Sequence, residues 1–104
     1  MAAHDGKVLE LVVFNLRAGT SRDEFLATVD GVSSWIAEQP GYVSSSLVED
    51  PRHGRSIDVV WWRSMEEAEA AAERAMSSES CAPMFGLIDM ESTLMVHGER
   101  VHAA

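Results

Sequence analysis

The stretch Ser56–Ala68, SIDVVWWRSMEEA, decides the fold because a strand pattern passes within it directly into a helix start. Its first half is rich in β-branched and aromatic residues and predicts a strand that ends near the pair Trp61 and Trp62. Ser64 and Glu67 have the spacing of a capping box, in which the serine oxygen accepts the backbone N–H of Glu67 and the glutamate reaches back. The stretch therefore predicts a strand that runs into a capped helix.

A second strand–helix unit precedes this stretch. Lys7–Arg17 is rich in Val, Leu and Phe and predicts the first strand. Ser21–Glu24 is another capping box, and Pro40 with Gly41 predicts the end of the helix that it opens. The apolar residues between these signals are spaced as one stripe on a single helix: Phe25, Val29, Val32 and Ile36.

The remaining segments complete a β-α-β-β-α-β order. Tyr42–Glu49 predicts the second strand, and the turn residues of Asp50–Gly54 predict a hairpin with the third strand, Ser56–Arg63. The second main helix carries alanines that allow it to approach the sheet closely: Ala68, Ala71, Ala72 and Ala75. Ala82–Ile88 predicts a short extra helix, and Glu91–His97 predicts the last strand. We therefore expect an α+β fold.

Length and composition restrict the class of protein. The 104 residues fit a single domain, for which we expect an ordered core at 7–97 and flexible ends at 1–6 and 98–104. The formal net charge of −9, from 17 acidic and 8 basic residues, disfavours nucleic acid and anionic membrane as partners. No apolar stretch is long enough to span a membrane. Cys81 is the single cysteine, which favours a reducing, cytoplasmic location.

Both faces of the predicted sheet are largely apolar. In the first strand one face carries Val8, Glu10, Val12, Phe14 and Leu16, and the other carries Leu9, Leu11, Val13 and Asn15. Right-handed crossovers place both main helices on the same face of the sheet. Leaving five or six apolar side chains of the other face in water would forfeit roughly 10 kcal/mol. We therefore expect a second copy of the chain to cover that face in a homodimer.

Three segments resemble a known family: Phe14–Gly19, Gln39–Tyr42 and Asp58–Ser64. Over roughly residues 8–97 the chain resembles the dimeric α/β-barrel superfamily and, within it, the antibiotic-biosynthesis-monooxygenase-like proteins. The resemblance implies a ferredoxin-like sandwich with an antiparallel sheet that pairs as a dimeric α/β barrel. Members of the family include cofactor-free oxygenases that act on phenolic polyketides, haem-degrading oxygenases and proteins without known activity.

The resemblance also implies functional positions. Oxygenase members use an Asn on the first strand and a Trp at the end of the third, and the nearest matches here are Asn15 and Trp62. Haem-degrading members use a His near the end of the second helix as iron ligand, whereas Arg74–Ser80 contains no His. The resemblance therefore favours chemistry without a cofactor.

The residues themselves leave several roles open. The Asn15 amide could stabilise an enolate-like charge, or could be satisfied by backbone groups at the strand edge. Trp61 and Trp62 point to opposite faces, where each either lines a pocket or anchors the core or an interface. Asp58 shares a face with Trp62, and a buried carboxylate there would have a raised pKa and act as a base. Alternatively, Asp58 pairs with Arg63 or with another arginine.

Histidine, cysteine and methionine give weaker signals. His97 either accepts a proton in a pocket or faces solvent. Cys81 either begins a helix, which would lower its pKa, or is a buried structural thiol. Neither His97 nor His53 has a second ligand at a standard spacing, so we expect no metal site. Several side chains could line a cavity between helices and sheet or simply fill the core: Met65, Met76, Met84, Met90, Met95, Phe25, Phe85 and Trp35.

On the resemblance, the expected function is that of a cofactor-independent monooxygenase-like protein acting on a small aromatic or polyketide-like substrate. The expected catalytic residues are Asn15, Trp62, Asp58 and His97, with no bound cofactor and no metal. The alternative is a non-catalytic dimer with the same pocket that binds a small molecule or serves in stress. A third reading is a haem binder with an unusual ligand.

Overall fold

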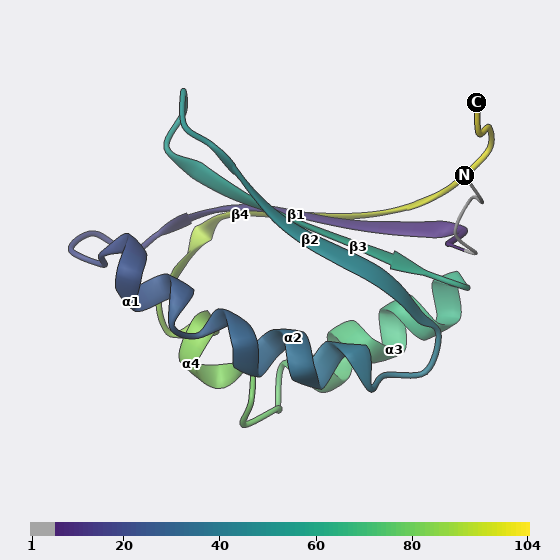
Figure 1. Cartoon of the computed structure of the whole chain (residues 1–104), viewed down its shortest axis with the longest axis horizontal. Helices are drawn as coiled ribbons and strands as arrows, with labels where there is room; N and C mark the ends of the chain where they lie inside the picture. Colours follow the sequence, from purple (N-terminus) through teal and green to yellow (C-terminus); the bar gives the residue numbers. More distant parts are fainter. Residues whose placement is uncertain (1–5) are drawn as a thin grey trace.

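The computed structural model describes residues 6–104, which form a four-stranded sheet with helices packed against it (Figure 1). The elements in chain order are β1 (Val8–Leu16), α1 (Arg22–Leu26), α2 (Val29–Ala37), β2 (Tyr42–Asp50), β3 (Arg55–Trp62), α3 (Met65–Ala75), α4 (Ala82–Phe85) and β4 (Ile88–Glu99). The sheet has the order β2-β3-β1-β4, and all three neighbouring pairs are antiparallel. This confirms the expected α+β, ferredoxin-like fold. The flexible end expected at residues 1–6 lies, apart from Gly6, outside the described residues.

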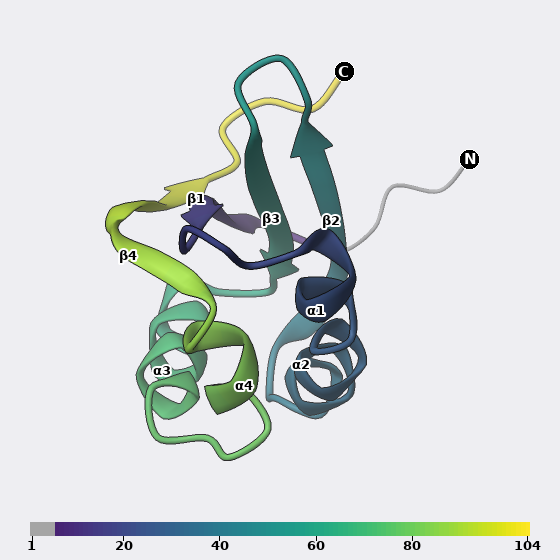
Figure 2. The ribbon, with the colours of Figure 1, turned by 90° about the vertical axis from the view of Figure 1, so that its left-hand side faces the viewer.

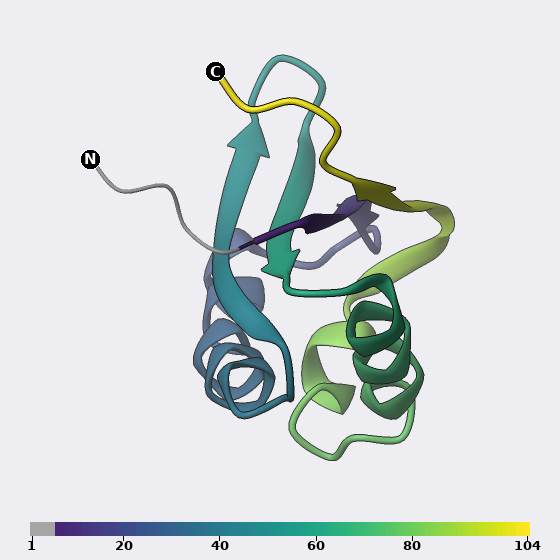
Figure 3. The ribbon, with the colours of Figure 1, turned by 90° about the vertical axis from the view of Figure 1, so that its right-hand side faces the viewer.

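All the described helices lie on one face of the sheet (Figures 2 and 3). The two crossovers explain this, because β1 and β2 run parallel with β3 between them, and β3 and β4 run parallel with β1 between them. The side chains of the inner face are buried: Val8, Phe14, Val60 and Trp62 are each at most 3% exposed. The outer face has no helix over it within the described chain, and Leu94 on that face is 59% exposed. None of the described helices is long and apolar enough to cross a membrane.

The helix predicted after Ser21 is broken in two. Ser21 caps α1 as expected, because its Oγ accepts the backbone N–H of Glu24 while the Glu24 carboxylate accepts the Ser21 N–H, each at 3.0 Å. The break before α2 falls at Thr28, whose hydroxyl donates to the carbonyl of Phe25 at 2.6 Å. A hydroxyl that occupies a backbone carbonyl competes with helical hydrogen bonding, which accounts for the break. The apolar stripe still faces the sheet, and Phe25 and Ile36 are buried.

The C-terminal segment departs further from the prediction. Helix α4 ends at Phe85 and β4 begins at Ile88, so the expected helix was too long and the expected strand too short. Strand β4 also continues to Glu99, which pairs with Val8, so residues 98 and 99 belong to the sheet and not to a flexible end. Residues 100–104 form neither helix nor strand.

A bulge near the start of β4 explains why the sequence hid this strand. The carbonyl of Asp89 accepts the hydroxyls of Ser92 and Thr93 at 2.9 and 3.0 Å. The register with β1 shifts at this point, between Val13 and Asn15. Polar residues that make a local turn inside a strand break the alternating pattern, so a sequence reading places the strand start too late.

The core of the inner face consists of two clusters. One lies against α3 and contains Val8, Ile36, Val60, Trp62, Ala68 and Ala71. The other lies against α1 and α4 and contains Phe14, Phe25, Met84 and Ile88. Ala68 and Ala71 are at most 2% exposed, as expected for alanines that bring α3 close to the sheet. A cavity lined by members of both clusters is the candidate functional site.

Candidate functional site

The candidate site is a cavity between the inner face of the sheet and helices α2, α3 and α4. It has a volume of about 120 Å³ and its wall is mostly apolar, with Trp35, Ile36, Ala72, Ala75, Phe85, Ile88 and others. A second hollow of about 120 Å³ adjoins it and shares Phe14, Val32, Asp58 and Met84. A cavity of about 150 Å³ lined by apolar side chains holds a benzene ring, so each hollow is near the size of one ring.

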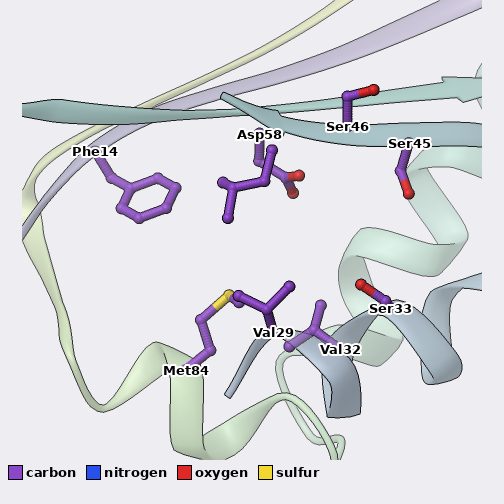
Figure 4. A pocket seen from close by; sticks show the side chains of 9 residues that line it. Phe14, Val29, Val32, Ser33, Ser45, Ser46, Asp58 and Met84 are labelled. Carbon is purple, nitrogen blue, oxygen red and sulfur yellow. The ribbon is translucent and has the colours of Figure 1, made fainter. Parts of the chain in front are cut away.

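Asp58 lies in the wall of both hollows. Its side chain leaves the middle of β3 toward α2, with Phe14 and Met84 to one side and Ser33 and Ser45 to the other (Figure 4). The strands β2 and β1 flank it, and its register partners there are Leu47 and Val12. A carboxylate therefore projects from the centre of the sheet into otherwise apolar space.

This position raises the pKa of Asp58 to about 6. Burial is the main cause because it disfavours the charged carboxylate, and the negative charge of Glu10 adds to the effect. A hydrogen bond from the backbone N–H of Val59 acts in the opposite direction. Among the described residues no cation contributes to the shift, and Arg63 is exposed at the end of β3, so the alternative that Asp58 pairs with Arg63 or with another arginine was wrong.

Glu10 is the second carboxylate in the wall of the cavity. It lies on β1, is 7% exposed, and is directly opposite His97 of β4. The two side chains are joined by a hydrogen bond of 3.0 Å between Glu10 Oε1 and His97 Nε2. His97 does not itself line the cavity. The alternation of β1 put Glu10 on the same face as Val8, Val12 and Phe14, but Glu10 was not predicted as a site residue, although an acidic residue among apolar neighbours was the available signal.

Trp62 lies apart from the cavity. Its side chain is fully buried in the cluster against α3, and its ring makes an edge-to-face contact with Tyr42 at 6.1 Å between centroids. The indole N–H of Trp62 has no hydrogen-bond partner among residues 6–104. Trp61 points to the outer face, where the guanidinium of Arg100 lies 4.5 Å from its ring centroid. Of the readings left open, the structure therefore places Trp62 as a core anchor.

Asn15 also lies outside the cavity. It is exposed at the end of β1, and its backbone N–H donates to the hydroxyl of Ser92 at 3.2 Å. Together with residues 16–20 and the β2–β3 hairpin it lines an open groove at the end of the sheet. Asp58 is not among the residues of that groove. The structure thus brings Asp58 together with Glu10 and, behind it, His97, but it does not bring Asn15 or Trp62 to them.

Cys81 lines the cavity as a buried thiol. Burial raises its pKa, and a hydrogen bond with Ser78 only partly offsets this. Although Cys81 immediately precedes α4, its side chain makes no capping hydrogen bond, so the reading as a thiol with a lowered pKa was wrong. Within the described part of the chain, no three His, Cys, Asp or Glu side chains form a group that could hold a metal ion.

Several solved structures have the same architecture as this chain, and some of them are named as oxygenases. SnoaB, a cofactor-independent oxygenase from Streptomyces nogalater, has a TM-score of 0.69 at 16% identity, over 94% of this chain and 96% of that chain. A monooxygenase from the gene ActVA-Orf6 of Streptomyces coelicolor, solved with the ligand nanaomycin D, has a TM-score of 0.64 at 17% identity, over 96% and 92%. The fold is that of antibiotic-biosynthesis-monooxygenase-like proteins.

A third structure shares this fold without an assigned activity. It is a dimeric ferredoxin-like protein of unknown function from Thermobifida fusca, with a TM-score of 0.70 at 10% identity, over 96% of this chain and 97% of that chain. No protein-family sequence profile matches the chain, and no curated protein sequence is significantly similar to it. At these identities the comparisons establish the fold, and the chemistry has to be argued from the cavity itself.

The cavity combines two properties that suit proton transfer from an apolar molecule. Its wall is mostly apolar, and Asp58 supplies a carboxylate that is more basic than usual. A general base is most effective when its pKa lies near the working pH, and the pKa of Asp58 is closer to neutrality than that of an ordinary aspartate. Glu10, held by its hydrogen bond to His97, is the second polar group in the wall of the cavity.

Proposed function

We propose that this chain is a cofactor-independent monooxygenase that oxidises a small aromatic, polyketide-like substrate in the cavity between sheet and helices. The single observation that carries the proposal is the Asp58 carboxylate, which projects into apolar space with its pKa raised to about 6. The shared fold with named oxygenases supports the reaction class, and two adjoining hollows, each near the size of one ring, support an aromatic compound of more than one ring as the bound group.

The reaction that fits this site needs a base and dioxygen. Asp58 removes a proton from the activated CH₂ of an electron-rich substrate such as an anthrone, and the apolar wall keeps the resulting carbanion away from water. The carbanion transfers electrons to O₂ and forms a carbon-bound peroxide anion, which takes the proton back from Asp58 and becomes the hydroperoxide. The Asp58 carboxylate then removes the second C–H proton, the O–O bond breaks, and the departing hydroxide takes that proton, which gives a carbonyl and water. The CH₂ group loses four electrons and O₂ gains four, so no external reductant is required.

The proton balance assigns roles to the neighbouring groups. The first proton that Asp58 takes from the substrate returns to the peroxide oxygen, and the second C–H proton passes through Asp58 to the departing hydroxide as water forms. His97 does not contact the substrate in this proposal. Its hydrogen bond of 3.0 Å to Glu10 holds the Glu10 carboxylate in place beside Asp58. Trp62 acts as a positioning residue at most, because it lies in the core beneath α3.

Oxygen uptake with a panel of anthrones and hydroquinones tests this proposal. Asp58→Asn keeps the size of the side chain and removes the base, so we expect the rate with an anthrone to fall about a hundredfold or more. Asn15→Ala is the matched control, because Asn15 lines the separate groove and its loss should leave the rate within about twofold. If Asn15→Ala abolished uptake while Asp58→Asn did not, the reaction centre would lie in the groove and the proposal would be wrong.

A non-catalytic ligand-binding protein is the second candidate function. The observation that favours it is that Asn15 and Trp62, the two positions that the resemblance to oxygenases implies, both lie outside the cavity that contains Asp58. Binding of an anthrone to the wild type, with oxygen uptake equal in wild type, Asp58→Asn and a protein-free blank, would support this candidate over the oxygenase.

We also infer that the chain acts as a homodimer. The outer face of the sheet supports this, since it carries apolar side chains from β1, β3 and β4 and no described element covers it. The dimeric structure from Thermobifida fusca has the same fold. Sedimentation of the wild type at micromolar concentration tests this part independently of oxygen uptake.

A further inference from the structure

The wall of the cavity is negatively charged. Among the described residues that line the two adjoining hollows, the ionisable side chains are Glu10, Asp58 and the thiol of Cys81. Neither lining contains Lys, Arg or His. The other lining residues from β1, β2, α2, α3, α4 and β4 are apolar or carry a hydroxyl, so nothing in the wall would neutralise an anionic group of a ligand.

His97 does not cancel this charge. Its Nε2 lies 3.0 Å from Glu10 Oε1, and His97 is not among the residues that line either hollow, so a protonated His97 would offset the charge of Glu10 and not that of Asp58. Asp58 would still face the cavity without a cation. The charge of the wall is therefore negative whether His97 is protonated or neutral, as long as Asp58 is ionised.

We propose that the cavity selects aromatic ligands that carry a hydrogen-bond donor and no negative charge, and that Glu10 and Asp58 together set this selectivity. The inference rests on the proposed function only in placing an aromatic ligand in this cavity. A phenol O–H or an ammonium N–H can donate to a carboxylate that has lost its water, whereas a ligand carboxylate would meet like charge in a medium of low dielectric. The substrate class is therefore a neutral or cationic phenol-type aromatic.

The most exposed parts of the lining support selection by charge over selection by shape. Met76 of α3 and Met90 and Met95 of β4 line the cavity and are 68%, 51% and 49% exposed. Methionine side chains are flexible and adapt to ligands of different outline. The two carboxylates, in contrast, are carried by paired strands of the sheet, so their backbone positions at the cavity are fixed.

Three near-isosteric phenols test the inference by NMR titration of the wild-type chain near pH 7.5. They are 4-ethylphenol (neutral), tyramine (cationic) and 4-hydroxyphenylacetate (anionic). We expect 4-ethylphenol and tyramine to bind at least about tenfold more tightly than 4-hydroxyphenylacetate, with shifts at Trp35 and Met84 in the cavity wall. Glu10→Gln and Asp58→Asn should each reduce the gap between the neutral and anionic ligands to about threefold or less.

Glu69→Gln is the matched control, because it removes one negative charge from an exposed position of α3 and should keep the full gap. Asp58→Asn decides the matter if Glu10→Gln, which loses its partner His97, does not fold. The inference is overturned if 4-hydroxyphenylacetate binds as well as 4-ethylphenol, if the gap persists in the variants that fold, or if none of the three ligands binds. Selective binding without oxygen uptake would leave this inference standing and remove the oxygenase proposal.

Discussion

Asp58 occupies a position where a carboxylate lowers the stability of the fold. Its pKa is 3.8 as an isolated side chain and about 6 in the folded chain, so the folded state binds the proton more tightly than the unfolded state does. Stability from this residue is therefore fully present below pH 3.8 and is lost as the pH rises through about 6. A residue that reduces stability at neutral pH, yet lines a cavity, fits a functional role better than a structural one.

Replacement of Asp58 makes this cost measurable. Asp58→Asn should raise the free energy of unfolding at pH 8 by up to about 3 kcal/mol, because the difference between the two pKa values no longer applies. Near pH 3.5 the same variant should differ little from the wild type. Urea unfolding at both pH values checks this, with Glu69→Gln as a surface control that should show no such trend. If the wild type were more stable than Asp58→Asn at pH 8, the pKa of Asp58 would not be higher in the folded chain than in the unfolded chain, and the prediction would be wrong.

The sequence predicted some residues of the site and not others, for physical reasons. Strand alternation was enough to place Asp58 on the same face as Trp62, and its apolar neighbours were enough to indicate a raised pKa if that face is buried. The pairing of Glu10 with His97 depends on the register between β1 and β4, which local sequence does not encode. The placement of Trp62 depends on how closely the small residues of α3 let the helix approach, and that is a property of the packed molecule.

At the scale of the elements, Ser21 provides a clear signal with a measurable effect. Its side chain and that of Glu24 satisfy each other's backbone N–H groups at the start of α1. Ser21→Ala removes the acceptor for the Glu24 N–H and should lower the free energy of unfolding by about 1 kcal/mol. Ser34→Ala, at an exposed position inside α2, should have little effect or raise stability slightly. Thermal unfolding of both variants distinguishes the loss of the capping hydrogen bond from the loss of a serine as such. Equal losses of stability in the two variants would show that the cap does not stabilise α1.

The turn between α2 and β2 requires glycine for two separate reasons at Gly41. Its φ is +86°, and a Cβ there would lie 2.5 Å from Cδ and 2.7 Å from Cβ of Glu67. Gly19 has nearly the same φ, +85°, with nothing within 4 Å of its Cβ position. Gly19→Ala should therefore cost about 1 kcal/mol from backbone strain, and Gly41→Ala should cost at least about 1 kcal/mol more from the clash. Urea midpoints measure the difference, and equal midpoints would show that Glu67 moves aside freely.

The order and type of the main elements followed from sequence, but several boundaries did not. Capping boxes and strand composition predicted both strand–helix units and the hairpin, because those signals are local. The break at Thr28 and the bulge at Asp89 come from side chains that bond nearby carbonyls in place of water, and an apolar pattern does not reveal which serine, threonine or aspartate will do so. Errors therefore fell where polar side chains compete with the backbone.

At the scale of the whole molecule, the sheet has one face packed and one face open. Leu11, Val59 and Val96 form a row across β1, β3 and β4 on the outer face, and Val96 is 44% exposed. The helices cannot reach this face, because both crossovers lead to the other side. The net charge of −9 opposes the association of two chains, so an apolar contact has to outweigh the repulsion.

A charge at the centre of that row should separate the proposed dimer. We expect the wild type to sediment at twice the 11.4 kDa of one chain at micromolar concentration, and more completely at higher salt, because salt screens the repulsion. Leu11→Arg would bury an unpaired cation between two sheets, so this variant should sediment as a monomer and unfold more easily. Glu69→Arg adds the same side chain on the exposed side of α3 and should remain dimeric. A wild type that stays monomeric and stably folded would show that the outer face tolerates water, and the proposed dimer would be wrong. The cavity on the inner face would be unaffected, because it is formed within one chain.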